Sequence, residues 1–216
     1  VQKPMPGSNL PLAALGTFIL WFGWFGFNGG SQLAAGTIED MSAVGKIMAN
    51  TNMAAAAGVV MALITSEIMF KKADLTFVLN GAIGGLVAIT AGPLEPALWQ
   101  SMIIGGVGGI IVVVAVPVLD KLNIDDVVGA IPAHLLCGIF GTMVVPFTSV
   151  SDGLNIWQQF GMQAAGVLSI GAFTAAASAL VWFALKKTMG LRPTVEDEMR
   201  GLDRAELGME AYPDFF

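Results

Sequence analysis

The chain has 216 residues, of which 55% are hydrophobic and 12% charged, and its mean hydropathy is +0.74. Soluble domains carry about 25% charged residues, so this composition excludes an ordinary soluble domain and indicates a membrane protein. The net charge of −6 gives no basic face for nucleic acid, and one cysteine with one histidine excludes an internal disulfide and a structural zinc site. We therefore expect no nucleic-acid partner, no metal and no cofactor.

Six apolar segments follow one another along the chain, each with roughly the 20 residues that a helix needs to cross a bilayer. They lie near 11–35, 44–70, 75–93, 97–118, 126–147 and 157–185. The connections are short and are polar or contain proline, which favours helical hairpins. The sequence predicts an all-α, polytopic membrane bundle of six transmembrane helices over residues 1–186, followed by a polar tail, 187–216.

The two ends of the chain carry different signals. The amino-terminal residues VQKPMPGSN are not expected to act as a signal peptide, and the missing initiator methionine indicates a processed or partial product. The tail holds seven acidic and four basic side chains, and so half of the net charge.

Lysine and arginine predict the orientation of the bundle, because they concentrate on the cytoplasmic side of membrane proteins. With six crossings, nine of the ten basic residues fall on the side of the two termini, and only Lys46 falls opposite. The nine are Lys3, Lys71, Lys72, Lys121, Lys186, Lys187, Arg192, Arg200 and Arg204. We expect a multi-pass protein of the inner or plasma membrane, in contact with the lipid bilayer, with both termini in the cytoplasm.

The first segment contains the aromatic stretch WFGWFGFNGGSQ, residues 21–32. Phe27 and Ser31 are spaced i and i+4, which places them on one helix face, a ring below a hydroxyl. Trp24 has two interpretations: an anchor at the membrane interface, or a part of the outer mouth that Phe27 and Ser31 would form. Asn28 follows Phe27 and is expected to be structural.

The next segments contain polar residues and glycines that we interpret as packing elements. Asn50, Thr51 and Asn52 open the run ANTNMAAAAG and are expected to form hydrogen bonds between helices. Two GxxxG patterns, Gly81–Gly85 and Gly105–Gly109, allow helix backbones to approach closely in lipid.

The fifth segment holds the only histidine, His134, within GAIPAHLLCG. A helix that begins near Asp126 puts His134 about 12 Å along its axis, toward the middle of the membrane. Pro132 removes a backbone donor and leaves the carbonyl near Val128 without its usual partner. One interpretation is a neutral ring bound to a neighbouring helix; the other is a ring that binds a small solute or passes a proton. Cys137 is expected to serve packing.

Four sequence blocks together resemble one family. WFGWFGFNGGS, ANTNMAAAAG, DDVVGAIPAHLLCGIFGT and the tail GLR…EDEMRGLDRAELGMEAY are similar, in order and over essentially all 216 residues, to the second half of ammonium transporters of the Amt/Mep/Rh family. The resemblance implies a trimeric transporter, not an enzyme. It also implies an eleven-helix fold of two inverted five-helix repeats plus a last helix, of which this chain holds the sixth to eleventh helices.

The resemblance also assigns roles to single residues. His134 corresponds to the second of two pore histidines, Phe27 to one of two stacked phenylalanines that close the outer vestibule, and Ser31, with Trp24, to ammonium recruitment. Asn28, Asn52 and Asp126 are expected to be structural polar residues. The partner histidine and phenylalanine lie in the five helices that this chain lacks, so we expect those helices to be needed for a complete pore.

In the mechanism that the resemblance implies, ammonium gives up its proton to paired imidazoles, ammonia crosses an apolar lumen, and the proton follows the histidines. Three alternatives remain: a passive path for neutral ammonia, a sensor or interaction module whose tail binds a PII-type protein, and a partial chain without transport activity. Three positions depart from the family pattern. Leu135 replaces a glycine, Leu207 replaces a histidine of the tail, and Ala205 stands where plant relatives have a phosphorylated hydroxyl.

Overall fold

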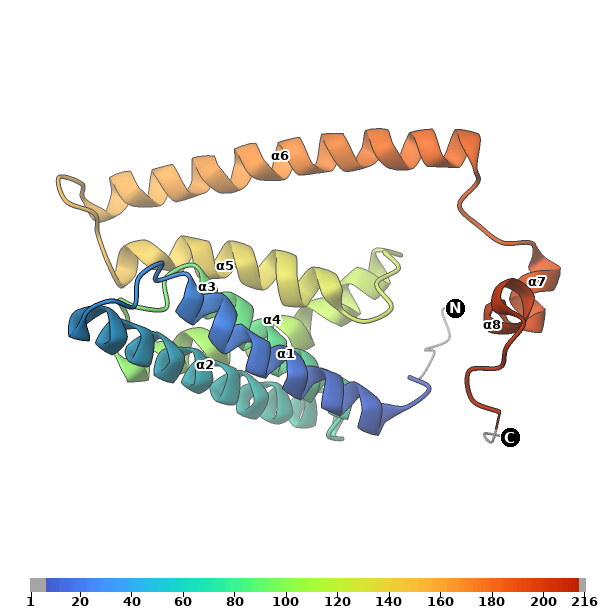
Figure 1. Cartoon of the computed structure of the whole chain (residues 1–216), viewed down its shortest axis with the longest axis horizontal. Coiled ribbons are helices and arrows are strands. Elements are labelled where there is room, and N and C mark those ends of the chain that lie inside the picture. The colour runs from blue at the N-terminus through green and yellow to red at the C-terminus, as the bar shows by residue number, and fades with distance from the viewer. Residues whose placement is uncertain (1–6, 214–216) are drawn as a thin grey trace. The chain divides into compact units, whose positions relative to one another are not determined.

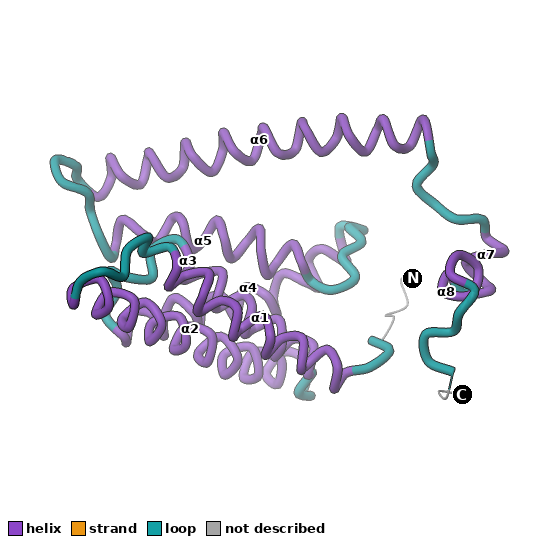
Figure 2. Tube along the Cα trace, viewed as in Figure 1, coloured by secondary structure: helices purple, strands orange, loops and turns teal. Residues whose placement is uncertain are grey.

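The computed structural model describes residues 7–213, and every regular element in this range is helical (Figures 1 and 2). Lys3 and Asp214 to Phe216 therefore lie outside the described residues. The chain divides into two compact units, one ending at Val167 and one starting at Leu168. The elements are α1 Leu10–Gly30, α2 Ile38–Phe70, α3 Leu75–Thr90, α4 Leu98–Lys121, a π-helical turn Ile131–Leu136, α5 Cys137–Val144, a 3-10 turn Val145–Phe147, α6 Ile156–Thr188, α7 Val195–Arg200 and α8 Leu202–Leu207.

Within the described residues, four helices are long and apolar enough to cross a membrane: α1, α2, α4 and α6. They match the first, second, fourth and sixth predicted segments. The third and fifth segments are also helical and apolar but shorter, α3 with 16 residues and the run Ile131–Phe147. The all-α, multi-pass membrane architecture predicted from composition is confirmed.

Two predicted helix boundaries on the first two segments are wrong, and the backbone shows why. The first helix ends at Gly30 rather than near 35, and Leu33 adopts a left-handed φ of 62° just beyond it. The second begins at Ile38 rather than 44, because Thr37 and Asp40 form a capping box. The Asp40 N–H donates to the Thr37 hydroxyl at 3.1 Å, and the Thr37 N–H donates to the Asp40 carboxylate at 3.2 Å.

The core of the first unit is the contact among α2, α3 and α4, and glycines make it possible. A Cβ atom at Gly81 on α3 would lie 2.7 Å from the carbonyl oxygen of Gly58 on α2, and a Cβ at Gly108 on α4 would lie 2.6 Å from the carbonyl oxygen of Gly84. A Cβ atom at Gly105 or Gly109 on α4 would likewise meet the backbone of α2. The GxxxG patterns thus serve packing, as predicted.

The tail has a small fold of its own. Thr194 caps α7, and Gly201, with a φ of 94°, turns the chain into α8. The Asp203 carboxylate then accepts the backbone N–H groups of Arg204 and Ala211, both at 2.9 Å, and Arg204 forms an ion pair with Glu210. These contacts close residues 203–211 into a loop.

We predict that substitution of Gly58 by alanine destabilises the bundle by about 1–3 kcal/mol, because the new methyl group must displace the α3 backbone. Thermal unfolding in detergent measures the change. Gly45 lies on the same helix in open space, so Gly45→Ala is the matched control. It should leave the midpoint unchanged or raise it slightly. Equal effects of the two substitutions would contradict the packing role.

We predict that the tail loop opens on acidification. The N–H groups of Ala211 and Arg204 hold the pKa of Asp203 below its ordinary value of 3.8. A lowered pKa means that the loop is fully stabilised above the ordinary carboxyl pKa and loses this stabilisation as pH falls through the lowered value. Amide exchange over 203–211 should therefore accelerate severalfold in Asp203→Asn at neutral pH. Glu206→Gln, a change at an exposed carboxylate without a hydrogen bond in the described chain, should have no effect.

Candidate functional site

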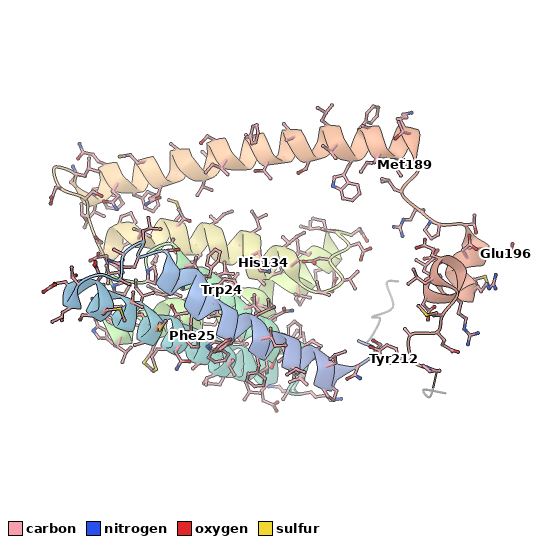
Figure 3. All side chains as sticks on the ribbon, viewed as in Figure 1. Trp24, Phe25, His134, Met189, Glu196 and Tyr212 are labelled. Carbon is pink, nitrogen blue, oxygen red and sulfur yellow. The ribbon has the colours of Figure 1, made fainter. Side chains whose placement is uncertain are left out.

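A hollow of about 370 Å³ lies in the first unit, between α1, α3 and the helical run that carries His134. Its lining residues are Trp24, Phe27, Val87, Thr90, Ala91, His134, Gly138 and Thr142. Trp24 and His134, far apart in the sequence, both line this space, and Figure 3 labels them on their helices. Three residues expected at a pore, Trp24, Phe27 and His134, are thus brought together.

The aromatic wall of the hollow is fixed by hydrogen bonds to α3. The indole N–H of Trp24 donates to the Thr90 hydroxyl at 2.8 Å, and that hydroxyl donates to the Leu86 carbonyl at 2.6 Å. The rings of Trp24 and Phe27 are tilted by 54°, with centroids 5.7 Å apart. Trp24 is therefore part of the wall of the hollow. This contact inside the bundle is not that of an anchor at the membrane interface. Phe27 remains 63% exposed within this chain.

The imidazole of His134 is exposed at the hollow. Among the described residues, none forms a hydrogen bond with its side chain, so no neighbouring helix of this unit binds the ring. His134, Gly138 and Thr142 follow at i, i+4 and i+8 and share one helix face. Both ring nitrogens can therefore bind a solute or a group from another chain.

The helix that carries His134 begins later than predicted. It starts at Ile131, not near Asp126, because the Asp126 carboxylate accepts the N–H groups of Ala130 at 2.9 Å and Ile131 at 2.8 Å. Asp126 is thus a structural cap, and Pro132 falls in the first turn, where its missing N–H is tolerated. His134 is therefore in the first turn of the helix, the fourth residue from Ile131, and not two turns into it as predicted.

Asn80 on α3 completes this helix start and was missed in the sequence. Its side-chain Nδ2 donates to the Val128 carbonyl at 2.7 Å, the carbonyl for which the sequence predicted a lost partner. Next to it, Gly129 has a φ of 73°, and a Cβ atom there would lie 2.9 Å from Nδ2. The available signal was a single amide within the otherwise apolar run LTFVLNGAIGGLVAIT.

His134 itself lies in the π-helical turn Ile131–Leu136. The Cys137 N–H that follows donates to the carbonyls of Pro132 and His134. Wide turns of this type are rare and occur often at functional sites. The sequence did not indicate this geometry.

Ser31, the hydroxyl expected at the outer mouth of the pore, does not line the hollow. The Ser31 hydroxyl lies exposed at the end of α1 and donates to the Phe27 carbonyl at 2.7 Å. Ser31 is not among the lining residues. Phe27 and Ser31 are one turn apart, as predicted, and this hydrogen bond joins them.

The other predicted polar residues differ in their roles. Asn28 is buried and donates to the Thr51 hydroxyl on α2 at 3.0 Å. The Nδ2 of Asn50, also buried, donates to the carbonyls of Pro93 and Pro96, both at 2.9 Å. Asn52 projects from the opposite face of α2, where its side chain is exposed and forms no hydrogen bond with the described residues, so its structural role stays a prediction.

No metal site accompanies these groups in residues 7–213, where no three His, Cys, Asp or Glu side chains gather to hold an ion. A second hollow of about 370 Å³ is lined by Leu63, Ile64, Glu67 and Ile68. All four belong to one helix, so this feature is a surface concavity of α2.

Comparison with known proteins identifies the family. A sequence profile of the Ammonium Transporter Family matches residues 2–212. The chain belongs to this family. It is 40% identical to ammonium transporter Amt2 of Archaeoglobus fulgidus over 99% of the chain and 48% of that protein, and 38% identical to ammonium transporter Amt1 of Haloferax mediterranei over 99% and 43%. These relatives are named transporters, in agreement with the expectation that the chain is not an enzyme.

Solved structures of the ammonium transporter family share the fold. A structure described as a sensor Amt protein superposes with a TM-score of 0.88 at 37% identity, covering 95% of this chain and 51% of the other. Mep2 of Candida albicans superposes with a TM-score of 0.80 at 29% identity, covering 97% and 49%. The resemblance seen in the four sequence blocks is confirmed. The chain spans about half the length of the relatives it matches.

Two positions beside His134 have different environments in this member of the ammonium transporter family. Leu135 is 55% exposed, so its bulk does not crowd the packing of this unit. Cys137 is fully buried, and its Sγ lies 3.4 Å from the Gly108 carbonyl oxygen. The packing role predicted for Cys137 agrees with this contact.

We predict that Asp126→Ala loosens the start of the His134 helix, at a cost of about 0.5–2 kcal/mol, because two backbone N–H groups lose their cap. Cys137, the only cysteine, reports local opening through its rate of modification by a membrane-permeant maleimide. The rate should rise in Asp126→Ala. The control is Asp125→Ala, which removes an adjacent exposed carboxylate without a hydrogen bond in the described chain. Unchanged labelling in both variants would contradict the capping role.

Proposed function

We propose that this chain forms one half of the wall of a pore that conducts ammonium or ammonia across the inner or plasma membrane. The observation that carries the proposal is that His134 faces a hollow whose other walls are the aromatic rings of Trp24 and Phe27. The family of the chain supports the choice of substrate. The other half of the wall comes from helices that this chain does not contain, as the half-length match to relatives supports.

The lining of the hollow favours deprotonation of the substrate. His134 is the only titratable side chain among the eight lining residues. A dehydrated cation is costly in such apolar surroundings, whereas neutral ammonia is not. Ammonium can transfer its proton to an imidazole nitrogen and continue as ammonia. Potassium has no proton to give and carries the full cost of its charge, so selectivity follows from this difference.

The aromatic residues define the approach to the histidine. The face of the Trp24 ring attracts a cation, and its hydrogen bond to Thr90 fixes the direction of that face. Phe27, in contact with Trp24, acts as one leaf of a gate. Ser31 stands one turn beyond Phe27 and assists recruitment at the outer mouth. In this proposal the assembled protein is a trimer whose tail, from 187 onward, lies in the cytoplasm and is available to a PII-type protein.

We predict that His134→Ala abolishes ammonium selectivity in the assembled transporter that contains this chain. In proteoliposomes, ammonium-driven current relative to potassium current should fall at least about tenfold, because no group remains to accept the proton and both cations then face the same desolvation cost. Asn52→Ala, at an exposed polar position of α2, is the control and should retain the ratio.

Two results would favour alternatives. Wild-type flux without any current, and retained selectivity in His134→Ala, would indicate a passive path for neutral ammonia. Wild-type current together with loss of selectivity in the variant supports the relay.

A second candidate function is that of a sensor or interaction module. The superposition on a structure described as a sensor Amt protein favours it, as does the closed loop at 203–211 in the tail. Binding of a PII-type protein to the assembled protein, with no ammonium flux under any condition, would support this function over transport.

A further inference from the structure

The helical run that carries His134 lies along a strip of residues on one face of α3. The strip consists of Asn80, Gly84, Val87 and Ala88, spaced i, i+4, i+7 and i+8 on one helix face. A Cβ at Gly84 would lie 3.2 Å from the Cys137 sulfur, a Cβ at Gly138 would lie 3.7 Å from Val87, and a Cβ at Gly141 would meet the Ala88 backbone. The two helices are therefore in contact over most of their common length.

Gly84 and Ala88 leave much of this strip smooth, since glycine and alanine present few protrusions that would oppose sliding of one helix along the other. In membranes, small residues bring helices close, whereas polar side chains specify which residues face each other. A single asparagine in an apolar helix seam fixes register in the same way in coiled coils. A slip by one turn would move His134 by about 5.4 Å along the wall of the hollow.

Asn80 is the only side chain of this strip that can form a directed bond. Its Nδ2 is 2.7 Å from the Val128 carbonyl oxygen, six residues before His134. The bond also depends on Gly129, because any Cβ there would press on the amide. α3 thus holds the start of the His134 helix through Asn80 and holds Trp24 through Thr90.

We propose that Asn80 is a positioning residue: its amide fixes the register of the His134 helix on α3 and so places the imidazole against the wall formed by Trp24. This inference rests on the proposed function of His134. Asn80 itself does not line the hollow and acts through the histidine.

The first test is a double-mutant cycle in the assembled transporter. Asn80→Ala keeps α3 helical and should lower the ammonium-to-potassium current ratio by about fivefold, the factor that corresponds to one ordinary hydrogen bond. The double variant with His134→Ala should be no worse than His134→Ala alone, because a misplaced ring and a missing ring fail in the same step. Asn52→Ala, with the same change at an unbonded position of α2, should behave as wild type.

The second test uses Asn80→Asp, which has the same shape but no donor when ionised. At neutral pH this variant should be impaired, since its carboxylate faces the Val128 carbonyl. Protonation restores an O–H donor, so its selectivity relative to wild type at the same pH should recover as pH falls from about 7 to about 4, the range in which carboxyl groups protonate. Asn52→Asp should follow wild type throughout.

The outcomes separate the two proposals. Additive effects of Asn80→Ala and His134→Ala, or no pH-dependent recovery in Asn80→Asp, would overturn the positioning role while leaving the role of His134 intact. Unchanged selectivity in His134→Ala would overturn the proposed relay and the positioning role with it. If Asn80→Ala does not assemble, Asn80→Asp decides the matter alone.

Discussion

The close approach of the α2, α3 and α4 backbones is the constraint on which the rest of this unit depends. Lipid offers no hydrophobic drive for helices to associate, so their packing rests on dispersion contacts that fade quickly with distance. Gly58 and Gly81 allow two backbones to touch, and Gly108 and Gly84 do the same for a second pair. Both α1 and the His134 helix pack against this platform, and both contact α3.

Polar side chains in this unit serve mainly to satisfy backbone groups where the helices are interrupted. Asn50 binds two carbonyls of the loop between α3 and α4, Asp126 binds two N–H groups at a helix start, and Asn80 binds the carbonyl of Val128. Among the described residues, no buried side-chain nitrogen or oxygen lacks a hydrogen-bond partner. Irregular backbone in a membrane protein is tolerated only where protein groups take up its hydrogen bonds, and these amides and carboxylates meet that requirement.

The hollow forms because α3 binds both α1 and the start of the His134 helix. α3 binds Trp24 through Thr90 at its end and Val128 through Asn80 nearer its middle. The same helix therefore positions both the aromatic wall and the helix that carries the histidine. This arrangement holds the Trp24 indole and positions the His134 imidazole, although the imidazole is exposed at the hollow.

The sequence by itself determined the membrane architecture and the family, and it singled out His134 as the candidate site residue, because apolar length, charge asymmetry and a lone imidazole in an apolar run are properties of the chain before it folds. It also indicated that the Val128 carbonyl would need a new partner, and that Gly81 and Gly105 serve packing. Tertiary structure alone decided that Asn80 is this partner, that Asn50 rather than Asn52 binds across the bundle, and that Ser31 stays outside the hollow. Those outcomes depend on which helix faces meet, and one residue of shift along a helix turns a side chain by about 100°, which no single segment of sequence specifies.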